Sequence, residues 1–158
     1  MPNALATEKM NYALARKKIS KLEEFVRAQP NHVEGDSDLC PLTHTFSDGI
    51  YTREIFIPKG VVVVGKIHKT EHPNFILTGR VRVTCSKTDE CIEIQAPFYF
   101  ISSPGLQKAV FALEDTTWVT IHKTDSTDLE EIEEEVIAKT YEELPEELKK
   151  EISCPGQQ

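Results

Sequence analysis

The segment from Gly65 to Gly79, G-K-I-H-K-T-E-H-P-N-F-I-L-T-G, is the most informative part of this 158-residue chain. It places two histidines, two lysines and an asparagine between runs rich in β-branched residues, and a glycine closes it. A second segment with turn residues, I-S-S-P-G-L-Q-K, runs from Ile101 to Lys108 and follows one hairpin later. Together the two segments predict a polar pocket framed by strands.

The region around these segments is typical of β structure. From Thr43 to about Lys123 the sequence is rich in β-branched and aromatic residues and is cut repeatedly by glycine and proline. Short strands at this spacing, with no helix between them, are typical of a sandwich, a jelly roll or a small barrel. We therefore predict a mainly β fold, with strands near 50–57, 61–67, 74–77, 80–86, 91–95, 98–101, 108–113 and 117–122.

Helices are expected on both sides of the β region. Apolar residues at helical spacing predict a helix from Thr7 to about Ala28. Thr127-Asp128-Leu129-Glu130 has the form of a capping box, which predicts an acidic helix, and a short helix over 146–152 follows. The expected organisation is an N-terminal helix and connecting arm (1–42), a β-roll (43–124) and a C-terminal acidic helical segment (125–158).

The net charge of −8 is unevenly distributed. Residues 125–158 hold twelve acidic and three basic side chains, whereas the rest of the chain has a net charge of +1. No stripe of lysine and arginine stands clear of acidic neighbours, which argues against binding of duplex nucleic acid. Because no apolar run approaches the roughly 20 residues of a membrane span and no secretory signal is visible, we expect a cytoplasmic protein without membrane contact.

Both segments resemble the two sequence motifs of the cupin superfamily. Counting back from the closing glycine, His68 stands at the second histidine position of the first motif, His72 at its glutamate position and Lys66 at its first histidine position. Pro104-Gly105 keep the turn of the second motif, and Lys108 stands near its metal-binding histidine. The resemblance implies a single cupin-type jelly roll, or double-stranded β-helix, in which most metal ligands of the family are substituted.

Three pieces of the sequence stand out as recognisable: Tyr51-Thr52-Arg53-Glu54, Gly65 to His72, and Glu114-Asp115-Thr116-Thr117-Trp118 leading to His122. With them, nearly the whole chain resembles a family of small, mostly uncharacterised cupin-like proteins encoded by tailed bacteriophages. This resemblance implies the cytoplasm of the host cell and a homo-oligomer, a dimer or higher. Phages gain from proteins that destroy or sequester the nucleotide signals of bacterial immunity, so it also implies a counter-defence role.

Strand alternation predicts that Lys66 and His68 share one strand face, and that Trp118 and His122 share a face of the last strand. If the polar and aromatic faces point inward, they form a cationic, histidine-rich pocket with aromatic walls, which suits an anion attached to a flat ring, such as a nucleotide. An outward orientation is the alternative for Lys66 and Lys108, because lysine is rarely buried without a partner. The candidate catalytic residues are His68, His72 and His122, and the candidate ligand-binding residues are Tyr51, Arg53, Lys66, Lys108 and Trp118.

Several functions stay open for this set. The preferred hypothesis needs no cofactor: the pocket binds a small nucleotide-like anion and either holds it or cleaves a phosphodiester, with histidines of near-neutral pKa as acid and base. The first alternative is a metal-dependent cupin enzyme in which His68, His72 and His122 hold a divalent transition metal. The second is a non-enzymatic virion or assembly protein whose terminal helices mediate the contacts.

Overall fold

The computed structural model describes residues 4–153, and within that range it describes the side chains of residues 12–150 except residue 89. The helical elements are α1 (Ala4–Arg27), α2 (Leu129–Val136), the 3-10 turn η1 (Tyr141–Glu143) and α3 (Glu146–Ser153). The strands are β1 (Leu42–Ser47), β2 (Ile50–Ile57), β3 (Val62–Val64), β4 (Ile67–His68), β5 (His72–Thr78), β6 (Arg80–Cys85), β7 (Thr88–Gln95), β8 (Phe98–Ser102), β9 (Lys108–Ala112), β10 (Thr116–Lys123) and β11 (Ile137–Ala138).

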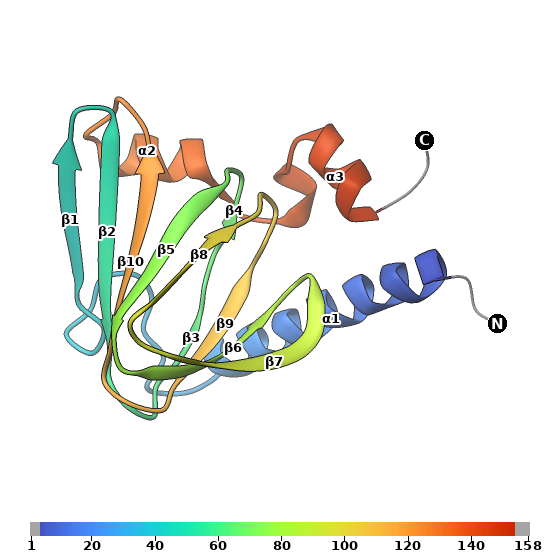
Figure 1. Ribbon diagram of the computed structural model, residues 1–158, viewed down its shortest axis with the longest axis horizontal. Helices are drawn as coiled ribbons and strands as arrows, with labels where there is room; N and C mark the ends of the chain where they lie inside the picture. Colours follow the sequence, from blue (N-terminus) through green and yellow to red (C-terminus); the bar gives the residue numbers. More distant parts are fainter. Residues whose placement is uncertain (1–3, 154–158) are drawn as a thin grey trace.

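The strands form two facing sheets that make a jelly roll (Figure 1). One sheet has five strands in the order β1-β2-β10-β5-β8, and the other has four in the order β3-β9-β6-β7. Neighbouring strands pair antiparallel throughout, and β4 pairs with β11 as a separate two-stranded ladder. The predicted fold class, a mainly β jelly roll with an N-terminal helix and C-terminal acidic helices, is confirmed.

Two tight turns show why glycine is required at particular positions. Gly79, which closes the Gly65–Gly79 segment between β5 and β6, has a φ of +86°. A Cβ atom at Gly79 would lie 2.3 Å from the carbonyl oxygen of Asp115, so no other residue fits without a shift of the backbone. Gly49, with a φ of +72°, joins β1 to β2. The Asp48-Gly49 pair is a hairpin signal that the strand prediction, which began at residue 50, did not use.

α1 packs on the four-stranded sheet. It begins at Ala4 rather than at the predicted Thr7, because the preceding Ala-Leu-Ala residues are themselves good helix formers. Its buried residues Ala15 and Ile19 are 2% and 1% exposed, and the helix contacts β3, β6 and β7 (Figure 1). None of the helices in the described residues is both long and apolar enough to cross a membrane.

α2 begins one residue later than the capping box predicted. The N-cap residue is Asp128, whose carboxylate accepts hydrogen bonds from the backbone N–H groups of Glu130 and Glu131 at 2.9 and 3.0 Å. A short acidic side chain at this position satisfies two helix N–H groups that have no partner within the helix and complements the helix dipole. The cap fixes where the chain turns after β10.

Candidate functional site

The interior of the roll changes from apolar to polar along its strands. At one end the inward side chains form an apolar core around Trp118, which is 4% exposed. Towards the other end the inward positions of β10 become Thr120 and His122, and those of β5 become Asn74 and His72. The apolar core therefore stops halfway, and a polar compartment occupies the rest. The core consists of Ile57, Ile76, Val81, Val83, Ile94, Val110, Ala112 and Trp118.

Three histidines meet in the polar compartment. His68 comes from β4, His72 from β5 and His122 from β10. The centroid of the His68 ring lies 4.2 Å from that of His72 and 5.4 Å from that of His122, and the His72 and His122 centroids are 4.7 Å apart. One ring nitrogen from each lies within 4.8 Å of the other two. Buried nitrogens His68 Nδ1, His72 Nε2 and His122 Nδ1 have no hydrogen-bond partner among the described residues.

The environment keeps these histidines neutral. Burial, helped by the mutual repulsion of nearby positive charges, lowers the pKa of His68 to about 2 and that of His122 to about 4. Burial also lowers the pKa of His72 to about 4, against the opposing effect of its hydrogen bond to a backbone carbonyl. At pH 7 each ring is therefore neutral, and one of its two nitrogens carries an available lone pair. The near-neutral pKa values expected for an acid–base pair are wrong, because the rings lie away from water.

The tautomer of His72 follows from one hydrogen bond. Its Nδ1 lies 3.1 Å from the carbonyl oxygen of Thr70. A carbonyl only accepts, so Nδ1 of the neutral ring carries the proton and Nε2 carries the lone pair. This is the arrangement in which a backbone carbonyl orients a metal-ligating histidine. Nε2 of His72 therefore presents its lone pair to the cluster and is oriented to bind a metal ion.

Two cations stand close to the histidines. Lys108, from β9 of the four-stranded sheet, is half-buried, and burial lowers its pKa to about 8. Its ammonium group donates a hydrogen bond of 2.7 Å to the hydroxyl oxygen of Ser102. Arg53, from β2 of the five-stranded sheet, points inward opposite Thr120, and burial lowers its pKa. Among the described residues neither cation forms an ion pair with a carboxylate.

A hydrogen-bonded network lies between the apolar core and the histidines. The indole Nε1 of Trp118 donates to Oδ1 of Asn74 at 3.1 Å, and Nδ2 of Asn74 donates to Ser102 Oγ at 2.9 Å and to the His72 carbonyl oxygen at 3.2 Å. Asn74 and Ser102 are fully buried. The candidate site residues predicted from the sequence did not include Asn74 or Ser102. Asn74 could have been found, because it lies two residues after His72 and side chains two residues apart on a strand share a face.

The structure brings seven of the eight candidate residues into the roll and leaves Lys66 out. Tyr51 stacks on His122, with ring centroids 6.0 Å apart, and shares a hydrogen bond of 2.7 Å with Nδ1 of His44. Trp118 belongs to the core and reaches the polar compartment only through its indole N–H. The expectation that Lys66 shares the inward face of His68 is wrong. Lys66 lies between β3 and β4, where strand alternation breaks, and its exposed side chain pairs with Glu133 of α2.

The chain after β10 covers the histidine-rich end of the roll (Figure 1). Ile132 and Val136 of α2 are 2% and 4% exposed and pack with Tyr51. β11 then pairs with β4, so that Ile137 lies opposite His68. The acidic segment is therefore more than a solvated tail: its apolar side closes the polar compartment, and its glutamates face outward.

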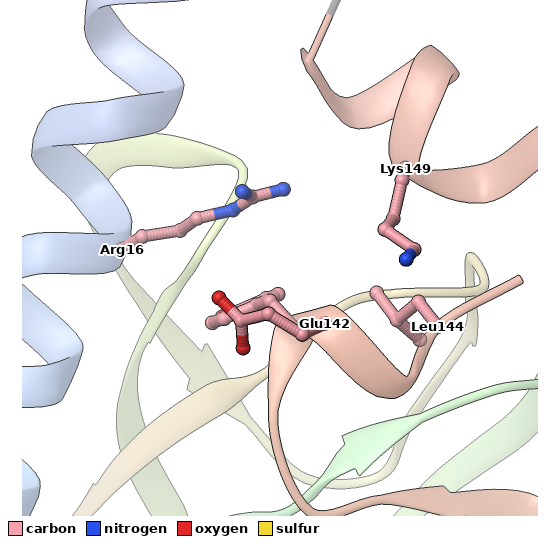
Figure 2. A pocket seen from close by; sticks show the side chains of 5 residues that line it. Arg16, Glu142, Leu144 and Lys149 are labelled. Atoms are coloured by element: carbon pink, nitrogen blue, oxygen red, sulfur yellow. The ribbon is translucent and has the colours of Figure 1, made fainter. Parts of the chain in front are cut away.

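A separate cavity of about 140 Å³ lies outside the roll, between α1, η1 and α3. Figure 2 shows Arg16 and Lys149 projecting towards it from opposite sides, with Glu142 and Leu144 on the side of η1. The Arg16 guanidinium carbon lies 4.3 Å from the ring centroid of Tyr141. None of the candidate site residues lines this cavity.

Comparisons with known proteins give similar solved structures but no matching family. No family model and no curated protein matches the chain. Solved structures similar to it are cupin superfamily proteins. One, from Desulfitobacterium hafniense, is 15% identical over 59% of this chain and 84% of that chain, with a TM-score of 0.48. The cupin domain of Schizosaccharomyces pombe Cnp3 is 17% identical over 65% and 74%, with a TM-score of 0.47. An RmlC-like cupin family protein from Methanocaldococcus jannaschii is 8% identical over 59% and 87%, with a TM-score of 0.48.

Proposed function

We propose that this protein binds a small anionic ligand beside a divalent transition-metal ion held by His68, His72 and His122. The observation that carries the proposal is the convergence of three buried, unpartnered imidazole nitrogens. Buried polar atoms almost always have a partner, and three neutral imidazoles that face one another are a donor set suited to zinc, iron or nickel. A bound metal supplies a Lewis acid with an open coordination position.

The residues of the chain favour an anion next to that metal. Arg53 and Lys108 reach the histidines from opposite sheets, and neither forms an ion pair with a carboxylate among the described residues, although Glu133 and Asp36 act electrostatically on Arg53. Two cations close to the histidines repel a metal ion, and an anionic ligand offsets that repulsion. Metal and anion are therefore expected to bind cooperatively, each raising the affinity of the protein for the other by the same factor.

The metal half of the proposal is tested on protein freed of metal by a chelator. Titration with Co²⁺ is followed by visible absorption, which reports the ligand field directly, and titration with Zn²⁺ by calorimetry. One equivalent should bind, and His68→Gln, His72→Gln and His122→Gln should each weaken binding by about tenfold or more. His32→Gln, in the loop after α1, is the matched control and should bind like wild type. If neither Co²⁺ nor Zn²⁺ forms a one-to-one complex, the proposed metal site is contradicted.

The anion half is tested with adenosine monophosphate and with inorganic phosphate as probes, each with and without Zn²⁺. Lys108→Met should weaken binding of both probes, because it removes a buried charge from the compartment. Lys66→Met is the matched control, since this lysine is exposed and pairs with Glu133. Equal losses for the two lysine variants, or no binding of either probe, would contradict the assignment of the ligand class.

A second candidate function is capture of a nucleotide-like anion without metal. Arg53 and Lys108, which form no ion pair among the described residues, support it. The resemblance to bacteriophage cupin-like proteins supports a host signalling nucleotide as the ligand and counter-defence as the role. Chelated protein is incubated with cyclic di- and trinucleotides, and the mixture is analysed by chromatography before and after heating. Intact nucleotide released only by heating indicates sequestration, and new products indicate a phosphodiesterase. If the nucleotide binds only after Zn²⁺ is added back, the metal-dependent function is supported instead.

A further inference from the structure

The cavity of about 140 Å³ between α1, η1 and α3 is separate from the histidine compartment and is lined by charged side chains. Arg16 and Lys149 reach it from opposite sides, and Glu142 lies on the side of η1 (Figure 2). Two cations and one carboxylate give this lining a net charge of +1. Because a water molecule occupies about 30 Å³ in the liquid, the cavity has room for a phosphate or carboxylate group.

The guanidinium of Arg16 is held beside two aromatic rings. Its carbon lies 4.3 Å from the ring centroid of Tyr141 and 6.0 Å from that of Tyr12, which stands one turn earlier on α1. Tyr141 is itself anchored, since its hydroxyl donates a hydrogen bond of 3.2 Å to Oε1 of Gln107. Contacts with aromatic rings occupy the faces of a guanidinium and leave the N–H groups at its edge for other partners.

The edge of this guanidinium lacks an acceptor in the part of the chain that the structure describes. Nε of Arg16 is buried and has no hydrogen-bond partner there, and Arg16 forms no ion pair with a described carboxylate. Burial lowers the pKa of Arg16, against the opposing effects of Tyr141, Tyr12 and Glu142. A cation that is partly withdrawn from water and has an unused N–H group is stabilised by an anion that accepts from it.

Lys149 supplies a second cation from α3. Its ammonium pairs with Glu146, three residues earlier on the exposed side of the helix, and pairs of this kind contribute so little that a ligand can replace Glu146. We infer that the cavity binds a small oxyanion, a phosphate or carboxylate group, between Arg16 and Lys149. The planar fork of Arg16 binds two oxygens of such a group. Glu142 in the lining disfavours a highly charged ligand. The inference does not depend on the proposed function of the interior.

The test is a nuclear magnetic resonance titration of the ¹⁵N-labelled full chain with sodium phosphate and, separately, with sodium acetate, at an ionic strength held constant with sodium chloride. The amide signals of Tyr141, Glu142 and Lys149 should shift saturably with at least one anion, and the anion that shifts them identifies the ligand as phosphate or carboxylate. Arg16→Gln should raise the dissociation constant about tenfold and Lys149→Gln about threefold. Lys17→Gln is the matched control, because it removes the same charge from an exposed neighbour on α1 and should bind like wild type.

Three results would overturn the inference. The first is the absence of saturable shifts at these amides with both anions. The second is an equal loss of affinity in Lys17→Gln and Arg16→Gln, which reports the general charge of α1 instead of a site. The third is loss of the shifts in Lys108→Met, which places the anion in the histidine compartment; their persistence in that variant separates the two sites. If Arg16→Gln does not fold, Arg16→Lys decides, because it keeps the charge and loses the fork, and wild-type affinity in this variant refutes the inference.

Discussion

Lowering the pH from 7 to 5 should destabilise the metal-free protein strongly, and the reason lies in the three buried histidines. In the unfolded chain a histidine has a pKa of about 6.5, whereas burial holds the pKa values of His72 and His122 at about 4 and that of His68 at about 2. The folded state therefore binds fewer protons than the unfolded state in this range. Stability is fully present above pH 6.5 and is lost as the pH falls from 6.5 towards 4.

The size of the effect follows from the same values. Each pH unit below 6.5 costs about 1.4 kcal/mol for each histidine that stays neutral in the folded state. At pH 5 this amounts to about 2 kcal/mol per histidine and about 6 kcal/mol for the three of them. Domains of this size are stable by about 5–15 kcal/mol, so the metal-free protein should lie near its unfolding transition at pH 5.

The assay is urea unfolding of chelator-treated protein at pH 7, 6 and 5, followed by the fluorescence of Trp118, the only tryptophan and part of the buried core. Replacement of His122 by glutamine should remove about a third of the pH dependence. The carboxylates contribute little here, because they titrate mainly below pH 5. A change in unfolding free energy of less than about 1 kcal/mol between pH 7 and pH 5 would refute the reasoning.

Two further substitutions test other parts of the interior. Lys108→Met should stabilise the metal-free protein by about 2–3 kcal/mol, because the lowered pKa of Lys108 reports a buried charge that the folded state holds at a cost. As the control, Lys66→Met should change the unfolding free energy by less than about 0.5 kcal/mol. A destabilised Lys108→Met protein would contradict the explanation. Gly79→Ala should destabilise by about 2 kcal/mol or more, since it combines a positive φ with a contact to the Asp115 carbonyl oxygen, and urea unfolding that gives wild-type stability would show that the turn relaxes.

Much of the fold could be predicted from local sequence because strands and turns leave local signals. β2 was predicted with its observed bounds, and Gly79 and Pro104-Gly105 mark real turns, since glycine and proline act on the backbone wherever they stand. β1 was missed although Asp48-Gly49 signalled a hairpin. β11 has only two residues and gains its strand character from pairing with β4, so no local pattern could reveal it.

For the interior, the sequence by itself determined that His68 and His72 stand close along the chain on β-rich segments and that His122 shares a strand face with Trp118. Only the tertiary structure decided that these three rings meet, that Lys108 points inward and that Lys66 points outward to Glu133. Alternation predicts relative faces within one strand but not which face is buried, and it fails where a strand breaks, as it does between β3 and β4. The lowered pKa values likewise depend on burial, which is a property of the packed roll and of the helix that closes it.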